Sequence, residues 1–211
     1  DWSSDVCSSD LLVAKIAAGR LQHVKEPLRL YYSGEVVRYE PPRAGRQSEF
    51  HQMGLEFLGG DGPTADVEVI AIAIECLEAV GVADFVVALS HPGVVASLLN
   101  EIGLSSGDPK RDLVVEALNR RDPIRIVAAL DGVGASGPAY QALAGLASDN
   151  GIRQSLRAAR AATIGNRDAQ SAIDELEAVA ESLDSAGLRG RIAIDLSENP
   201  ALDYYTGLVF Q

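Results

Sequence analysis

Apolar residues behind the first ten positions recur at the spacing of a helix. The repeat consists of Leu12, Val13, Ile16, Ala17 and Leu21. It predicts one amphipathic helix over residues 11–21. Two β-prone patches follow within residues 28–39, with Gly34 between them, and predict strands separated by a kink or bulge. Alternating positions over residues 49–58 predict a returning strand, so this segment is expected to form an antiparallel hairpin with a long basic loop.

Helices dominate the pattern after the hairpin. Thr64 is expected to cap a helix over residues 65–80, and an apolar run within residues 84–90 has the length of a buried strand. A helical section, rich in Ala and Leu, then extends from about residue 92 to about residue 188. Its expected breaks lie at residues 105–109, at residues 131–138 and at Gly165. Two strands, over residues 192–196 and 203–210, are expected last.

This order predicts an α+β domain over residues 11–211. The domain would hold a mixed, mainly antiparallel sheet flanked by helices, with the helical section inserted between the hairpin and the last strands. Residues 1–10 are rich in Ser and Asp and lack an apolar period, so we expect a poorly packed tail, and a non-native one such as translated adapter sequence. The strand that stops at Gln211 suggests a fragment.

Charge and composition restrict the function. The 211 residues are 47% hydrophobic, yet no run approaches the roughly 20 apolar residues of a membrane span, so a cytoplasmic protein is expected. A net charge of −12 opposes broad phosphate-backbone binding and makes tRNA an unfavoured partner. The basic residues that do cluster suit a small anionic ligand. They are Arg29, Arg38, Arg43 and Arg46.

Residues 38–56 hold the most informative pattern. Arg38 and Arg46 can each bind a phosphate through a guanidinium fork, and the acidic and amide side chains can bind amino or imidazole groups. These acceptors are Glu40, Gln52 and Glu56. Gln52, Gly54 and Glu56 follow a period of two, so they are expected to share one face of a strand, where Gly54 leaves room for a ligand. Exposed charges on an ordinary hairpin are the alternative.

Two separated motifs resemble a known family. Residues 38–56 contain Arg-x-Glu, then Gly-Arg, then Phe-x-Gln-x-Gly-x-Glu, as in motif 2 of histidyl-tRNA synthetases and their paralogues. Residues 202–205 read Leu-Asp-Tyr-Tyr, which is similar to the family's histidine-specific motif. The resemblance implies a class II aminoacyl-tRNA synthetase-like fold. It also implies a histidine pocket and a vestigial ATP site. The pocket would be formed by Arg46, Gln52, Glu56, Tyr204 and Tyr205, and the ATP site by Arg38 and Glu40.

One departure separates this chain from the active enzymes. Those enzymes carry Arg-Gly immediately before Leu-Asp-Tyr-Tyr, where this chain has Pro200 and Ala201. Proline supplies neither charge nor donor, so the electrostatic stabilisation of a transition state is missing at this position. With this departure, the chain resembles a paralogous family, the regulatory subunits of ATP phosphoribosyltransferase.

The resemblance to this paralogous family implies a non-catalytic role without a cofactor. Its expected partners are a short-form ATP phosphoribosyltransferase catalytic subunit, L-histidine as effector in feedback regulation, and further copies of the chain. The alternative is a fragment of a histidine-tRNA ligase that activates histidine with ATP.

The remaining polar residues favour structural roles. His51 alternates with Gln52 and is expected to be packed or exposed on the opposite face. His91 precedes Pro92 at a strand end, where a surface or capping role is expected. No two histidines share metal-ligand spacing, and Cys7 and Cys76 suggest neither a disulfide nor a metal site.

Overall fold

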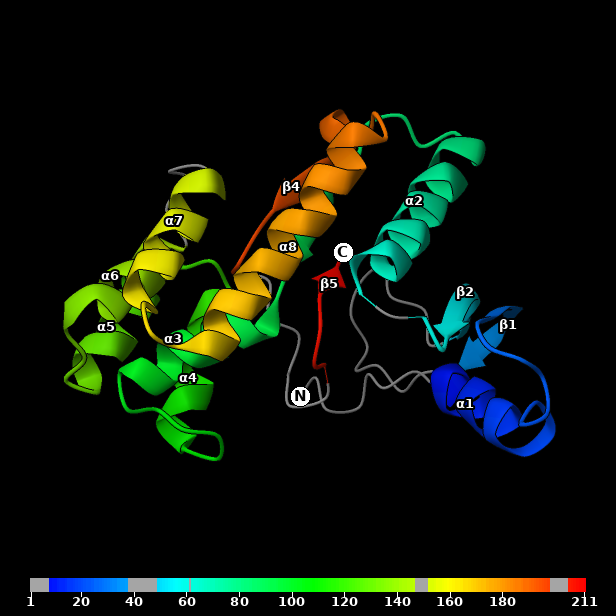
Figure 1. Ribbon diagram of the computed structural model, residues 1–211. Coiled ribbons are helices and arrows are strands. Elements are labelled where there is room, and N and C mark those ends of the chain that lie inside the picture. Colours follow the sequence, from blue (N-terminus) through cyan, green and yellow to red (C-terminus); the bar gives the residue numbers. More distant parts are fainter. Residues whose placement is uncertain (1–7, 38–48, 61, 147–151, 198–204) are drawn as a thin grey trace. The chain divides into compact units, whose positions relative to one another are not determined.

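The computed structural model describes residues 8–37, 49–60, 62–146, 152–197 and 205–211 (Figure 1). The chain divides into two compact units, Asp1–Ala65 and Asp66–Gln211. No helix in the described ranges is both long and apolar enough to cross a membrane.

The first unit pairs one helix with a two-stranded sheet. Helix α1 (Ser8–Arg20) precedes strands β1 (Leu28–Val37) and β2 (Glu49–Leu58), which pair antiparallel. The predicted helix and returning strand are confirmed. The predicted kink at Gly34 is wrong, because Gly34 stays in register opposite Gln52 and the alternation of burial continues along β1. Ten consecutive residue pairs therefore form one uninterrupted ladder.

Helix α2 (Pro63–Ala79) crosses the division between the units. It begins at Pro63, so Thr64 lies in its first turn and the prediction that Thr64 precedes the helix is wrong. Proline suits the first helical position because its φ is already helical and its missing N–H would have no partner inside the helix. Ile70 and Ile74, one turn apart, are fully buried and fix this helix to the core.

The second unit contains a three-stranded mixed sheet. Strand β3 (Val87–Ser90) lies between β4 (Ile192–Ile194), which is parallel to it, and β5 (Val209–Phe210), which is antiparallel. All three strands were predicted, with longer limits. A parallel pair cannot be closed by a tight turn. The long helical section supplies the crossover between β3 and β4.

The predicted helical section is confirmed as a series of helices. They are α3 (Pro92–Glu101), α4 (Pro109–Asn119), α5 (Pro123–Gly132), α6 (Gly137–Gly145), α7 (Ile152–Ala162) and α8 (Arg167–Ser185). The three predicted breaks are confirmed. A further break between α4 and α5 was missed: Arg121 adopts a φ of 51°, and Asp122 caps α5 by accepting from the backbone of Ile124 and Arg125. Proline after a capping residue starts this helix.

Helices α3 and α8 form much of the core of the second unit. Val94 and Leu98 of α3 are fully buried, as are Ile173 and Leu176 of α8. Leu89 of β3 belongs to the same cluster and is also fully buried. The β3 end that leads into α3 is therefore held against α8 by a continuous apolar core.

Candidate functional site

Three of the predicted positions lie together on β2. Gln52, Gly54 and Glu56 stand opposite Gly34, Tyr32 and Leu30 of β1, and all six are partly buried. The register confirms that the three β2 residues share one face. The Gln52 side-chain amide donates a hydrogen bond of 2.9 Å to the Tyr32 hydroxyl. A phenol and an amide are thus already paired on this face.

Tyr32 occupies the space above Gly54. An added Cβ at Gly54 would come under 3.0 Å from the ring and hydroxyl of Tyr32, a separation that real Cβ atoms essentially never show. The room that the sequence predicted for a ligand at Gly54 is therefore filled by a neighbouring aromatic ring, and that prediction is wrong. Glycine is needed here because the Tyr32 ring covers this position, so that any Cβ would overlap it.

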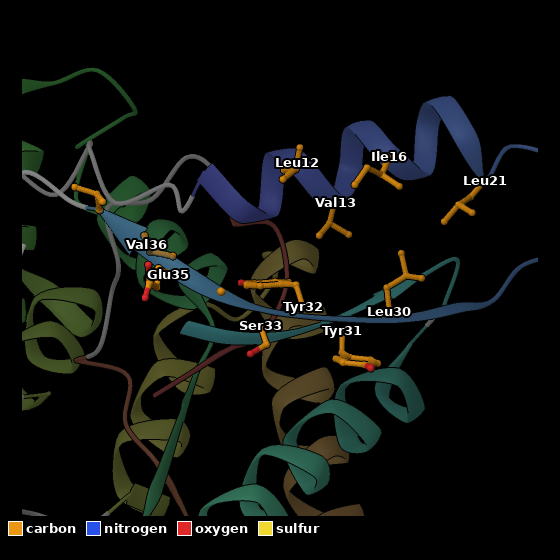
Figure 2. Close-up of a pocket in the computed structure, with 12 residues that line it drawn as sticks. Leu12, Val13, Ile16, Leu21, Leu30, Tyr31, Tyr32, Ser33, Glu35 and Val36 are labelled. Atoms are coloured by element: carbon orange, nitrogen blue, oxygen red, sulfur yellow. The ribbon is translucent and has the colours of Figure 1, made fainter. Parts of the chain in front are cut away.

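The face of β1 that carries Leu30 and Tyr32 is directed toward α1. In Figure 2, Leu30 and Tyr32 point toward the helix, whereas Tyr31 and Ser33 point away. Together, α1 and β1 line an apolar groove of about 450 Å³. The helix contributes Leu12, Val13 and Ile16, and Leu21 follows directly after its last residue. The predicted apolar face of α1 is therefore confirmed as the side that faces β1, although Leu12 keeps 58% of its surface exposed.

The other face of the hairpin holds different groups. The Arg29 guanidinium lies 4.5 Å from the centre of the Phe57 ring, its cross-strand partner. His51 is exposed, as predicted, and its Nε2 lies 2.8 Å from the Ser33 hydroxyl. Arg29 therefore does not share a face with Gln52 and Glu56.

The remaining predicted positions are distributed differently. Arg38, Glu40, Arg46 and Tyr204 lie outside the described residues, as does the predicted basic loop. Tyr205 belongs to the second unit and is 46% exposed. It precedes Gly207 and strand β5, whose Val209 pairs with Ser90 at the end of β3.

A polar cluster in the second unit lies beside this strand end. His91 is 3% exposed, and its Nε2 lies 3.7 Å from a carboxylate oxygen of Glu175 on α8. Burial lowers the pKa of His91, while the carboxylate of Glu175 acts in the opposite direction. Burial and the charge of Glu175 raise the pKa of Asp66 on α2. Of the two alternatives expected for His91, a capping or a surface role, capping is confirmed, and the side chain is buried.

The described residues offer no ready metal centre. No group of three or more His, Cys, Asp or Glu side chains in the described part of the chain could hold an ion. Cys76 is a free, exposed thiol.

With this geometry established, comparison with known proteins identifies the family. The histidyl-tRNA synthetase family model matches residues 9–211. The chain belongs to the histidyl-tRNA synthetase family. A structure titled as an ATP phosphoribosyltransferase regulatory subunit/histidyl-tRNA synthetase from Bacillus halodurans superposes with a TM-score of 0.81 at 30% identity, covering 94% of this chain and 51% of that one. The predicted class II synthetase-like α+β fold is thereby confirmed.

The chain is similar both to regulatory subunits of ATP phosphoribosyltransferase and to a histidine–tRNA ligase. The ATP phosphoribosyltransferase regulatory subunit of Moorella thermoacetica is 37% identical over 201 residues, which is 94% of this chain and 50% of that protein. The histidine–tRNA ligase of Pyrobaculum aerophilum is 31% identical over 205 residues, covering 94% of this chain and 46% of the ligase. The chain spans about half the length of these curated relatives.

Sequence reasoning missed two residues of these surroundings, Tyr32 and Glu175, and the burial of His91. Tyr32 was seen only as part of a β-prone patch, although its position opposite Gly54 in a hairpin would have placed the two side by side. Glu175 gave no signal, because it is one of several acidic residues on a helix. The burial of His91 depends on α8, which lies more than 70 residues away in the sequence.

Proposed function

We propose that this chain is part of a non-catalytic regulatory subunit of ATP phosphoribosyltransferase, which binds L-histidine and passes feedback inhibition to a short-form catalytic subunit. The observation that carries the proposal is the replacement of Arg-Gly by Pro200-Ala201 immediately before Leu-Asp-Tyr-Tyr. An aminoacyl-adenylate reaction needs charge stabilisation at that position, and proline offers none. The greater identity to the Moorella regulatory subunit than to the Pyrobaculum ligase supports the same choice.

The proposed histidine pocket combines groups suited to an imidazole. The Glu56 carboxylate and the Tyr205 phenol would bind the two ring nitrogens, with Gln52 and Tyr204 beside them and Arg46 at the carboxylate of the effector. A pocket built from such polar groups discriminates because a ligand that leaves them unpaired is penalised. The hydrogen bond between Gln52 and Tyr32 supports this arrangement, since it fixes the Gln52 amide on the face that Glu56 shares.

Regulation would operate through linkage. Histidine can change the activity of a partner only by binding one assembly state more tightly than another, and the partner must then change histidine affinity by the same factor. Arg38 and Glu40 would be remnants of the ATP site. Self-association of the subunit is part of the proposal and rests on the family resemblance.

The test uses the intact protein that contains this chain. It is mixed with a short-form catalytic subunit, and phosphoribosyl-ATP formation is measured with and without histidine, while histidine-dependent ATP–pyrophosphate exchange is measured in parallel. Activation that histidine suppresses, without exchange, is the expected result. Exchange without activation would show a histidine–tRNA ligase and overturn the proposal.

Variants of one hairpin residue and of Tyr205 locate the effector site. Glu56→Ala is expected to weaken histidine binding, and with it the response, by about 1–3 kcal/mol of binding free energy, the cost of leaving an imidazole nitrogen unpaired. Tyr205→Phe is expected to have a similar effect. The matched control is Glu35→Ala, which removes an exposed carboxylate from the opposite face of the same hairpin. Equal responses in all three variants would place the effector elsewhere.

A further inference from the structure

A buried imidazole connects the end of β3 to helix α8. The Nδ1 atom of His91 accepts a hydrogen bond of 3.1 Å from the Gly93 backbone N–H and so caps α3. Because Nδ1 is the acceptor, the proton of the neutral ring belongs on Nε2. That atom lies 3.7 Å from Glu175 Oε2, longer than a hydrogen bond but within reach of an ionic interaction. Ser90, beside it, is fully buried.

Glu175 also lies near the segment that carries Tyr205. Its other oxygen, Oε1, lies 3.6 Å from the point that a Cβ at Gly207 would occupy. Gly207 stands two residues after Tyr205 and two residues before Val209, which pairs with Ser90. One carboxylate of the helical section therefore lies near both the end of β3 and the segment that leads into β5.

The two roles of His91 exclude each other once the ring is charged. Protonation places a hydrogen on Nδ1, which then cannot accept from Gly93, so the cap of α3 is lost. In the described part of the chain, the charged groups recorded around His91 are Glu175 on α8 and, next to Glu175, Asp66 on α2. Burial favours the neutral ring, and the Glu175 carboxylate favours the charged one. The contact between His91 and Glu175 therefore depends on the position of α8, the helix that carries Glu175.

We propose that Glu175 is a positioning residue for the histidine site: through its contact with His91 and its proximity to Gly207 it couples α8 to the Tyr205–Gly207 segment, so that a shift of α8 changes histidine affinity. The inference rests on the proposed function, in which Tyr205 contacts the effector. It adds a physical connection between the helical section and that site. A partner that displaces α8 would then alter histidine binding, as reciprocal coupling requires.

The variant Glu175→Gln keeps the shape of the side chain and removes its charge. We expect it to weaken histidine binding by roughly fivefold or more, the lower end of ordinary coupling between sites. Because charging His91 removes the cap of α3, we expect histidine binding to weaken at acidic pH. Glu175→Gln also removes the group that favours charged His91, so this loss is expected to move to lower pH. Glu175→Asp, which restores the charge one methylene further back, is expected to recover part of the affinity.

The experiment is isothermal titration of the intact protein with L-histidine from pH 5.5 to 8.5, together with the titration of the His91 ring followed by NMR. The matched control is Glu181→Gln, which neutralises an exposed residue of the same helix. Weaker binding and a shifted pH profile in Glu175→Gln, with Glu181→Gln like the wild type, support the proposal. Equal affinities and pH profiles in both variants overturn it. No histidine binding by the wild type would instead overturn the proposed function, and the positioning role with it.

Discussion

The contact between Gly54 and Tyr32 offers a quantitative test of the hairpin. Gly54→Ala places a methyl group where the Tyr32 ring lies. If the ring stays, the overlap costs about 1–3 kcal/mol of unfolding free energy, as overpacking does. If the ring swings away, the Gln52–Tyr32 hydrogen bond is lost, at a cost of about 0.5–1.5 kcal/mol. In either case we expect destabilisation of about 1 kcal/mol or more.

A double-mutant cycle isolates this effect. Unfolding of the wild type, Gly54→Ala, Tyr32→Ala and the double variant is followed by circular dichroism in urea. Without the ring, Gly54→Ala is expected to be neutral or slightly stabilising, because alanine restricts the unfolded chain more than glycine. The coupling energy is therefore expected to be about 1 kcal/mol or more. Gly34→Ala, on the neighbouring strand with nothing within 4 Å of its added Cβ, serves as the control. An equal cost of Gly54→Ala with and without Tyr32 would refute the reasoning.

Three further predictions concern the second unit. Leu176→Ala, at a fully buried position of α8, is expected to cost about 2–5 kcal/mol in urea unfolding, whereas Leu113→Ala, at a position 60% exposed, is expected to change stability by less than about 0.5 kcal/mol. Thr163→Val removes the buried hydroxyl that lies 3.0 Å from the Gln170 amide, which also donates to the backbone carbonyls of Arg160 and Thr163. Because those two bonds remain, we expect a cost of about 0.5–1.5 kcal/mol by the same assay, and a clearly larger cost would contradict this reasoning. Because the pKa of His91 is lowered in the folded protein, stability is expected to fall as the pH drops below the ordinary value of 6.5. Thermal unfolding of His91→Asn, which keeps a capping oxygen but does not titrate, is expected to show a flatter pH profile, and an unchanged profile would contradict the assignment.

The sequence by itself determined the order and type of the elements. Apolar spacing located α1, α2 and the helical section, because a buried stripe on a helix requires residues three and four apart. Alternation located β2 and put Gln52 and Glu56 on one face, since successive side chains of a strand point to opposite sides. The two motifs gave the family because they are local in sequence, and the replacement at Pro200 was visible for the same reason.

Tertiary structure decided what depends on neighbours far apart in the chain. Gly34 alone suggested a kink, but pairing with Gln52 across the hairpin keeps β1 regular. Gly54 suggested an opening, but Tyr32 fills it. His91 looked like a surface residue until α8 covered it and brought Glu175 to its ring. Local spacing fixes which face a side chain takes, whereas burial, electrostatic partners and free space are set by the element that packs against that face.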